Sequence, residues 1–178
     1  MITKELIKQI FEEAKIQSDY YNCKIVWISK NRCLKLSGKS VYDKVFKALG
    51  VYDDGFARET LFFSNINTKS ILICPQLLNK RFESLSHTLE DFSLYIKYAV
   101  LHEIGHLKLN KRGSSSREEA FVSDFAYSFF NETERNILKS IEVAMYKELG
   151  EKLVSAVEKL GKDTAIKIVN EIDPTMLE

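Results

Sequence analysis

The strongest constraint on the fold of this chain is residues 89–109, a long segment whose apolar and aromatic positions recur with the period of an α-helix. Near its end stand five consecutive residues, His102-Glu103-Ile104-Gly105-His106. Side chains four positions apart lie on one face of a helix, one turn from each other. The segment therefore predicts a helix that presents two imidazoles side by side.

The pattern H-E-x-x-H on a helix is typical of zinc sites in hydrolases. Two neutral imidazoles can bind one Zn²⁺ and leave it Lewis-acidic, and Glu103, rotated by one residue, can act as a general base toward an activated water. The alternative is that His102 and His106 are core histidines whose ring nitrogens are hydrogen-bonded. The helical context favours the zinc site.

Length and composition limit the classes of protein to which the chain can belong. A chain of 178 residues, 45% hydrophobic and 29% charged, can bury a core of its own, which argues against a disordered protein. A net charge of +1 gives no general attraction to nucleic acid or to an anionic membrane, so neither is an expected partner. The apolar runs are far shorter than the roughly 18 residues that a membrane helix needs.

The N-terminal residues and the cysteines favour a cytoplasmic location. The first eight residues mix charged and apolar side chains in an amphipathic helix pattern and lack the apolar centre of a signal peptide. Cys23, Cys33 and Cys74 match neither a disulfide framework nor a Cys-x-x-Cys zinc site, so we expect them to be reduced and buried.

The rest of the chain predicts an α+β fold. Before the central segment we expect a helix, a strand, a short helix ended by Gly50, and two strands that form a hairpin or a sheet edge, at residues 1–17, 23–29, 41–49, 59–65 and 69–75. After it, a helix through Phe130 is followed by three amphipathic helices, divided by Gly150 and Gly161, at residues 133–149, 151–160 and 163–172. We expect a core at residues 1–131 and a C-terminal helical region at 132–178, packed on that core.

A catalytic zinc site needs a third protein ligand. The metzincin pattern would place a glycine and a third histidine where this chain has Leu109 and Arg112, so that option fails. The next predicted helix begins with Glu118 and Glu119, and a short turn can bring a carboxylate back to the two histidines. Each glutamate could instead cap that helix, Glu118 with Ser115 and Glu119 with Ser116.

Over about residues 85–130 the chain resembles the gluzincin zinc metallopeptidases, among them the small soluble minigluzincins and ImmA/IrrE-type peptidases. In that family H-E-x-G-H is followed by a helix with the pattern Glu-x-x-Ala-(Asp/Asn)-x-Phe-Ala, whose glutamate is the third ligand. Matching Phe125-Ala126 to the final pair implies that Glu119 is this ligand, with Glu118 as the alternative. The chain departs from the pattern at Val122 and Ser123.

The resemblance also implies features around the metal. It implies a zincin-like fold, in which a small twisted sheet packs on an active-site helix and a ligand helix. Residues 69–74 occupy the place of the edge strand that binds extended peptide, although an internal strand fits them equally well. Asp124 is a candidate hydrogen-bond partner of His102 or a surface residue, and Tyr95, Tyr98 and Tyr127 are candidates to support the oxyanion or simply core aromatics.

We therefore expect a zinc metallopeptidase with His102, His106 and Glu119 as ligands, Glu103 as general base, and a protein or peptide as substrate. The competing hypothesis is a catalytically degenerate zinc-binding zincin that acts as a regulatory or protein-binding module. The C-terminal region carries an apolar stripe that predicts packing on the core or pairing with a second copy as a homodimer; its residues are Ile137, Leu138, Ile141, Ala144, Met145 and Leu149.

Overall fold

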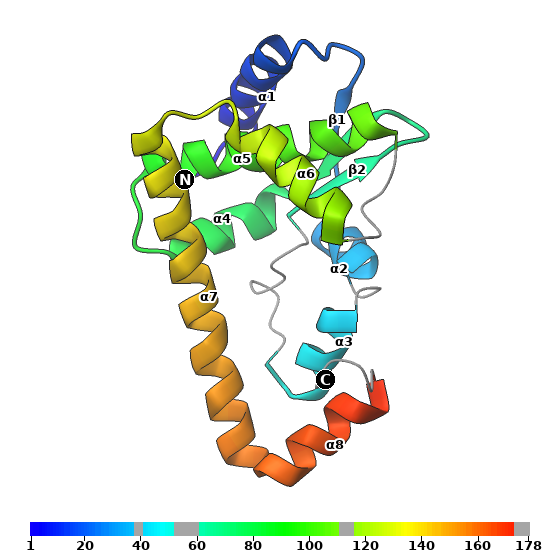
Figure 1. Ribbon diagram of the computed structural model, residues 1–178, viewed down its shortest axis with the longest axis vertical. Coiled ribbons are helices and arrows are strands. Elements are labelled where there is room, and N and C mark those ends of the chain that lie inside the picture. Colours follow the sequence, from blue (N-terminus) through cyan, green and yellow to red (C-terminus); the bar gives the residue numbers. More distant parts are fainter. Residues whose placement is uncertain (38–40, 52–60, 111–115, 173–178) are drawn as a thin grey trace.

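The computed structural model describes residues 1–37, 41–51, 61–110 and 116–172. They form an α+β fold in which helices surround a small sheet (Figure 1). The elements in chain order are α1 Lys4–Ser18, β1 Lys24–Trp27, α2 Lys30–Ser37, α3 Val41–Ala48, β2 Phe62–Asn65, β3 Ser70–Ile73, α4 Pro75–Ser84, α5 Leu89–Leu109, α6 Ser116–Tyr127, α7 Glu132–Leu160 and α8 Lys162–Ile172.

The sheet is mixed, and β3 is its middle strand. β1 pairs with β3 in parallel, and β2 pairs with β3 in antiparallel fashion, which confirms the predicted hairpin. All four residues of β3 are buried, as expected for a strand covered on both faces and flanked on both sides. The interpretation of residues 69–74 as an edge strand is therefore wrong. In the described sheet, β2 lies at the edge.

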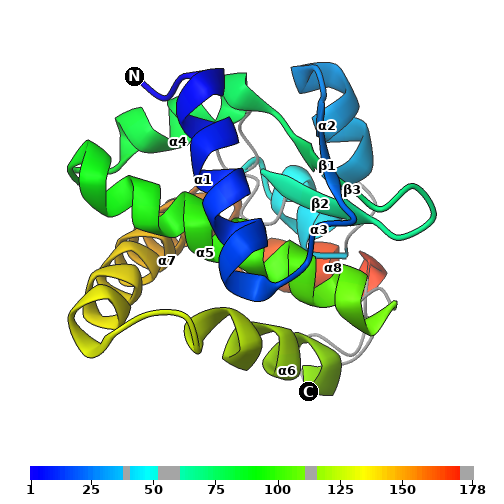
Figure 2. The ribbon, with the colours of Figure 1, turned by 90° about the horizontal axis from the view of Figure 1, so that it is seen from above.

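Helix α5 lies at the centre of the molecule, and its bounds agree with the predicted segment. The Thr88 side chain caps its N-terminus by accepting a hydrogen bond from the Asp91 backbone N–H, and Asn110 ends it in the left-handed conformation, φ 52°. Viewed from above, α1 crosses over α5, α6 runs alongside α5, and the sheet lies beside it (Figure 2). Helix α5 therefore contacts most of the elements that build the core.

The larger of two hydrophobic cores, here called the first core, surrounds α5. It joins the buried faces of α1, the sheet and α4 to one face of α5 and to the N-terminal part of α7. Helix α7 contributes three buried side chains, Leu138, Ile141 and Met145. These three belong to the apolar stripe that the sequence placed in the C-terminal region.

A second core lies where α7 extends beyond the first core to meet α8 (Figure 1). It joins α3 to the C-terminal part of α7 and to α8. Its buried residues are Val45, Leu49, Val51, Leu149, Ala156 and Ala165. The C-terminal region thus packs against two separate parts of the chain.

The predicted break at Gly150 is wrong, because α7 continues through this residue to Leu160. A glycine inside a helix costs only about 1 kcal/mol relative to alanine, and burial of Met145 and Leu149 on one side and Ala156 on the other outweighs that cost. Gly161, with φ 82°, does end the helix.

Two helices, α2 and α4, were not predicted. Helix α4 begins with Pro75, whose fixed φ and missing N–H suit the first turn of a helix, so the proline that closes β3 also starts α4. The three cysteines are free and buried, as expected. None of the described helices combines the length and apolar character needed to cross a membrane.

Candidate metal centre

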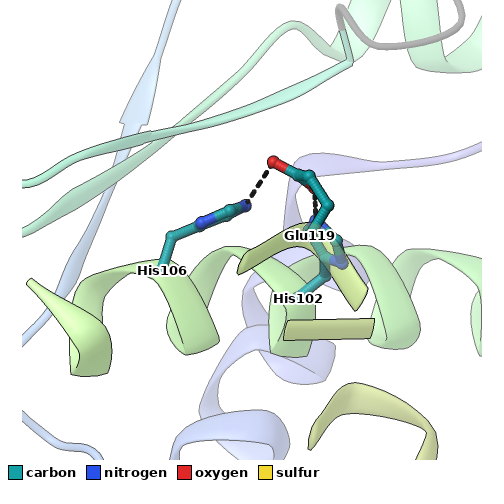
Figure 3. Close-up of side chains that lie close together, drawn as sticks. All are labelled: His102, His106 and Glu119. Carbon is teal, nitrogen blue, oxygen red and sulfur yellow. Dashed lines mark ion pairs between the residues drawn. The ribbon is translucent and has the colours of Figure 1, made fainter. Parts of the chain in front are cut away.

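The two histidines of H-E-x-x-H lie on adjacent turns of α5, with ring centroids 5.0 Å apart. The His106 side chain is buried, whereas His102 keeps 19% of its side-chain surface exposed. Both Nε2 atoms face the same carboxylate, that of Glu119 on α6 (Figure 3). One face of α5 therefore presents two imidazole nitrogens to a carboxylate from the next helix.

A close approach of α6 to α5 brings Glu119 to this position. Gly105 makes the approach possible, because a Cβ at this residue would lie 2.9 Å from Val122 Cγ1 and 3.1 Å from Phe125 Cδ1. Val122 is fully buried and has a stiff side chain, so it has little room to move away. The glycine of the motif thus sets the distance between the histidine helix and the helix that carries Glu119.

The distances within the group suit a single ion. Glu119 Oε2 lies 3.3 Å from His102 Nε2, and Oε1 lies 3.5 Å from His106 Nε2. All the ligand atoms lie within 4.8 Å of one another, and this is the group of the described chain with metal-binding geometry. A hydrogen bond from His102 and the nearby His106 hold the pKa of Glu119 below its ordinary value. The carboxylate is therefore ionised, as a metal ligand must be.

The structure places Glu119, and not Glu118, in this group. The carboxylate of Glu119 faces the two imidazoles. The cap predicted between Ser115 and Glu118 lies outside the described residues, since Ser115 is not among them.

Glu103 points to the sheet, another of the elements that contact α5. Its side chain is partly buried, and it accepts hydrogen bonds from both the hydroxyl and the backbone N–H of Ser64 on β2. Burial raises the pKa of Glu103 to about 7, although His102 and the two Ser64 donors favour its charged form. Sequence reasoning missed Ser64, because no spacing rule connects a serine in a short strand with a helix almost forty residues later.

The hydrogen-bond partner that the sequence suggested for His102 is not found in the structure. Asp124 is exposed and is not a hydrogen-bond partner of His102, so the surface interpretation holds. The Nδ1 atom of His102 is buried and has no hydrogen-bond partner among the described residues. Ser123, where the resembled family has Asp or Asn, hydrogen-bonds instead to Tyr98, one turn before His102 on α5.

The candidate tyrosines are held by other groups. Burial raises the pKa of Tyr98 to about 12, and its ring stacks on that of Tyr127 at 4.7 Å. The Tyr127 hydroxyl donates to Glu142 Oε1 of α7 at 3.1 Å, and Tyr95 is buried in the first core. These contacts favour the interpretation of the three tyrosines as core and interface aromatics.

Comparison with protein families, curated proteins and solved structures finds no match for this chain. Any functional conclusion therefore depends on the geometry and chemistry of the site itself.

Proposed function

We propose that this protein is a zinc-dependent peptidase of the gluzincin type, with a zincin-like fold and a cytoplasmic location. The observation that carries the proposal is the convergence of His102, His106 and Glu119, with Glu103 on the same helix as the two histidines. The three free, buried cysteines agree with a reducing compartment.

The donor set fits zinc. Ligands about 2.0–2.1 Å from a tetrahedral zinc ion lie about 3.4 Å from each other. The two histidine–glutamate distances, 3.3 and 3.5 Å, run to different oxygens of the Glu119 carboxylate, and one ligand atom from each of the three residues lies within 4.8 Å of the others. Two imidazoles and one carboxylate form a common catalytic set, and a zinc ion held by them would supply a Lewis acid that lowers the pKa of water toward neutrality.

The protein's own residues supply the remaining chemistry. Glu103 can accept a proton from the attacking water at its carboxylate and later deliver it to the leaving amine, and a pKa near 7 suits both transfers. Glu119 is half-exposed, so solvent reaches the group. The substrate that we propose is an extended protein or peptide segment paired along β2, the edge strand that contacts α5.

The competing proposal, a zinc-binding module without catalysis, is favoured by one observation. Histidine ligands commonly donate their second ring N–H to an acceptor that fixes the ring, and loss of such a partner lowers metal affinity or activity. In the described residues His102 Nδ1 lacks that partner. A weakened or structural metal site would show this feature.

One variant separates the two proposals. Glu103→Gln should leave zinc content near one per chain, but should lower the rate of peptide hydrolysis on the order of 10² to 10⁴-fold. His106→Ala is the matched control and should lose zinc. A variant with full activity would exclude Glu103 as the base, and a parent protein without zinc uptake would exclude the peptidase. Equal inertness of parent and variant on peptides and candidate proteins would favour the binding module.

A further inference from the structure

Ser64 contributes two hydrogen-bond donors to a single carboxylate. Both its hydroxyl and its backbone N–H donate to Glu103, and its side chain is 8% exposed. A glutamate side chain has three rotatable bonds. Two hydrogen bonds from the same residue limit rotation about these bonds more than one hydrogen bond would. The Glu103 carboxylate is thereby tied to the sheet as well as to its own helix.

The strand pairing defines where this carboxylate lies. Ser64 is opposite Ile71 in the antiparallel pair of β2 and β3. In such a pair the N–H and C=O of one residue point to the same side of its strand, and successive residues alternate. Because the Ser64 N–H goes to Glu103, this residue directs its backbone groups away from β3. Glu103 is therefore held beside the free edge of β2 in the described sheet, where it accepts the outward backbone N–H of Ser64.

We propose that Ser64 is a positioning residue for the general base. The inference rests on the proposed function: it assigns to Ser64 the task of holding the Glu103 carboxylate between the metal group and the edge of β2. An ionised carboxylate offers about four acceptor positions. The two donors of Ser64 leave positions free to accept a hydrogen bond from water, so the contact orients the base without blocking it.

The first experiment measures the contact without activity. A double-mutant cycle on the full-length protein compares Ser64→Ala in two backgrounds, the parent and Glu103→Ala, by thermal unfolding. We expect Ser64→Ala to lower the Tm of the parent by about 3 °C and to have almost no effect when Glu103 is already alanine. Equal losses in both backgrounds would overturn the proposal, because a purely structural role of Ser64 does not depend on Glu103.

The second experiment measures catalysis, with a matched serine as control. Ser70 on β3 is also buried, but its hydroxyl lies 2.7 Å from Thr68 Oγ1 and not on Glu103. Ser64→Ala keeps the backbone donor and should lower kcat about tenfold, with KM and zinc content unchanged. Ser64→Thr restores a hydroxyl and suits a strand, so it should recover most of kcat. Ser70→Ala should leave kcat unchanged.

The outcomes distinguish this proposal from the proposed function. An equal fall in kcat for Ser64→Ala and Ser70→Ala, or no recovery with Ser64→Thr, overturns the positioning role while the peptidase stands. If the parent is active but Ser64→Ala lowers the Tm equally with and without Glu103, the positioning role is also overturned. A zinc-loaded parent that hydrolyses no peptide overturns the proposed function and the positioning role with it.

Discussion

The two cores of this protein differ in composition and in what they hold. The first core, around α5, buries large aliphatic and aromatic side chains from helices and sheet alike, and the metal group lies on one face of its central helix. The second core joins three helices over six buried residues, two of which are alanines, and α8 buries only Ala165 there. The candidate metal group therefore lies beside the core that buries the larger side chains.

Two helical glycines show the same contrast. Gly105 in the first core has neighbours so close that a Cβ would collide with Val122, whereas a Cβ at Gly150 of α7 would meet nothing within 4 Å. The first glycine serves a close contact between helices, and the second serves none in the described structure. Identical residues therefore carry different constraints, which depend on what surrounds them.

The largest effect is expected from truncation after Asn131. The shortened chain loses Leu138, Ile141 and Met145 from the first core and all of α8, so it should not fold cooperatively. Circular dichroism with a thermal melt measures this. A chain that ends at Gly161 is the control: it loses only α8 and should still fold and bind zinc. A folded chain of residues 1–131 with raised peptidase activity would show instead that the C-terminal region inhibits the enzyme.

Alanine substitutions should show in which core a buried side chain contributes more to the free energy of unfolding. Ile141 is fully buried in the first core, and Leu149 is 8% exposed in the second. We expect Ile141→Ala to lower the free energy of unfolding by about 4 kcal/mol and Leu149→Ala by about 2 kcal/mol, because the smaller core can collapse more easily around the lost atoms. Urea denaturation gives both values. The reverse order would mean that the second core is the better packed.

We expect Glu103 to make the stability of the protein depend on pH. The pKa of Glu103 rises from 4.5 to about 7 on folding, so the folded state binds this proton more tightly than the unfolded state does. The resulting stability is complete below pH 4.5 and is lost as the pH rises through about 7, by up to about 3 kcal/mol. Urea denaturation of the metal-free protein at a series of pH values measures the loss.

Two variants check the source of this pH dependence. Glu103→Gln cannot ionise, so it should flatten the curve between these pH values and exceed the parent in stability at pH 8. Leu149→Ala should shift the whole curve downward and keep its shape. A Gln variant with the parent's slope would assign the pH dependence to other groups.

The two glycines should give effects of opposite sign, and the smallest of all is expected at Gly150. Gly105→Ala should lower the free energy of unfolding by about 2 kcal/mol and weaken zinc binding about tenfold, because α6 must move away from α5 and take Glu119 with it. Gly150→Ala should raise the free energy of unfolding by about 0.5–1 kcal/mol and leave zinc affinity unchanged. Denaturation and competition with a zinc chelator measure the two quantities. Equal effects at both sites would remove the distinction between the cores.

Local periodicity was sufficient for the helix that carries the two histidines. The bounds of α5 agree with the sequence pattern, because a long helix with its own caps depends little on distant residues. The same reasoning failed at Gly150, where burial at both ends of α7 outweighs a local helix-breaking preference. It also missed α2 and α4, which are short helices of eight and ten residues.

Sequence alone determined that two imidazoles share one face of α5, because helical geometry fixes the relation of residues four apart. The sequence also limited the candidates for the carboxylate beside the two histidines to Glu118 and Glu119. The tertiary structure decided between these two, since the approach of α6 at Gly105 depends on packing against Val122 and Phe125. It likewise decided that β2 lies at the sheet edge, that Ser64 meets Glu103 and that Asp124 faces solvent. Such contacts join residues far apart in the chain, and only the packing of the whole core sets their distances.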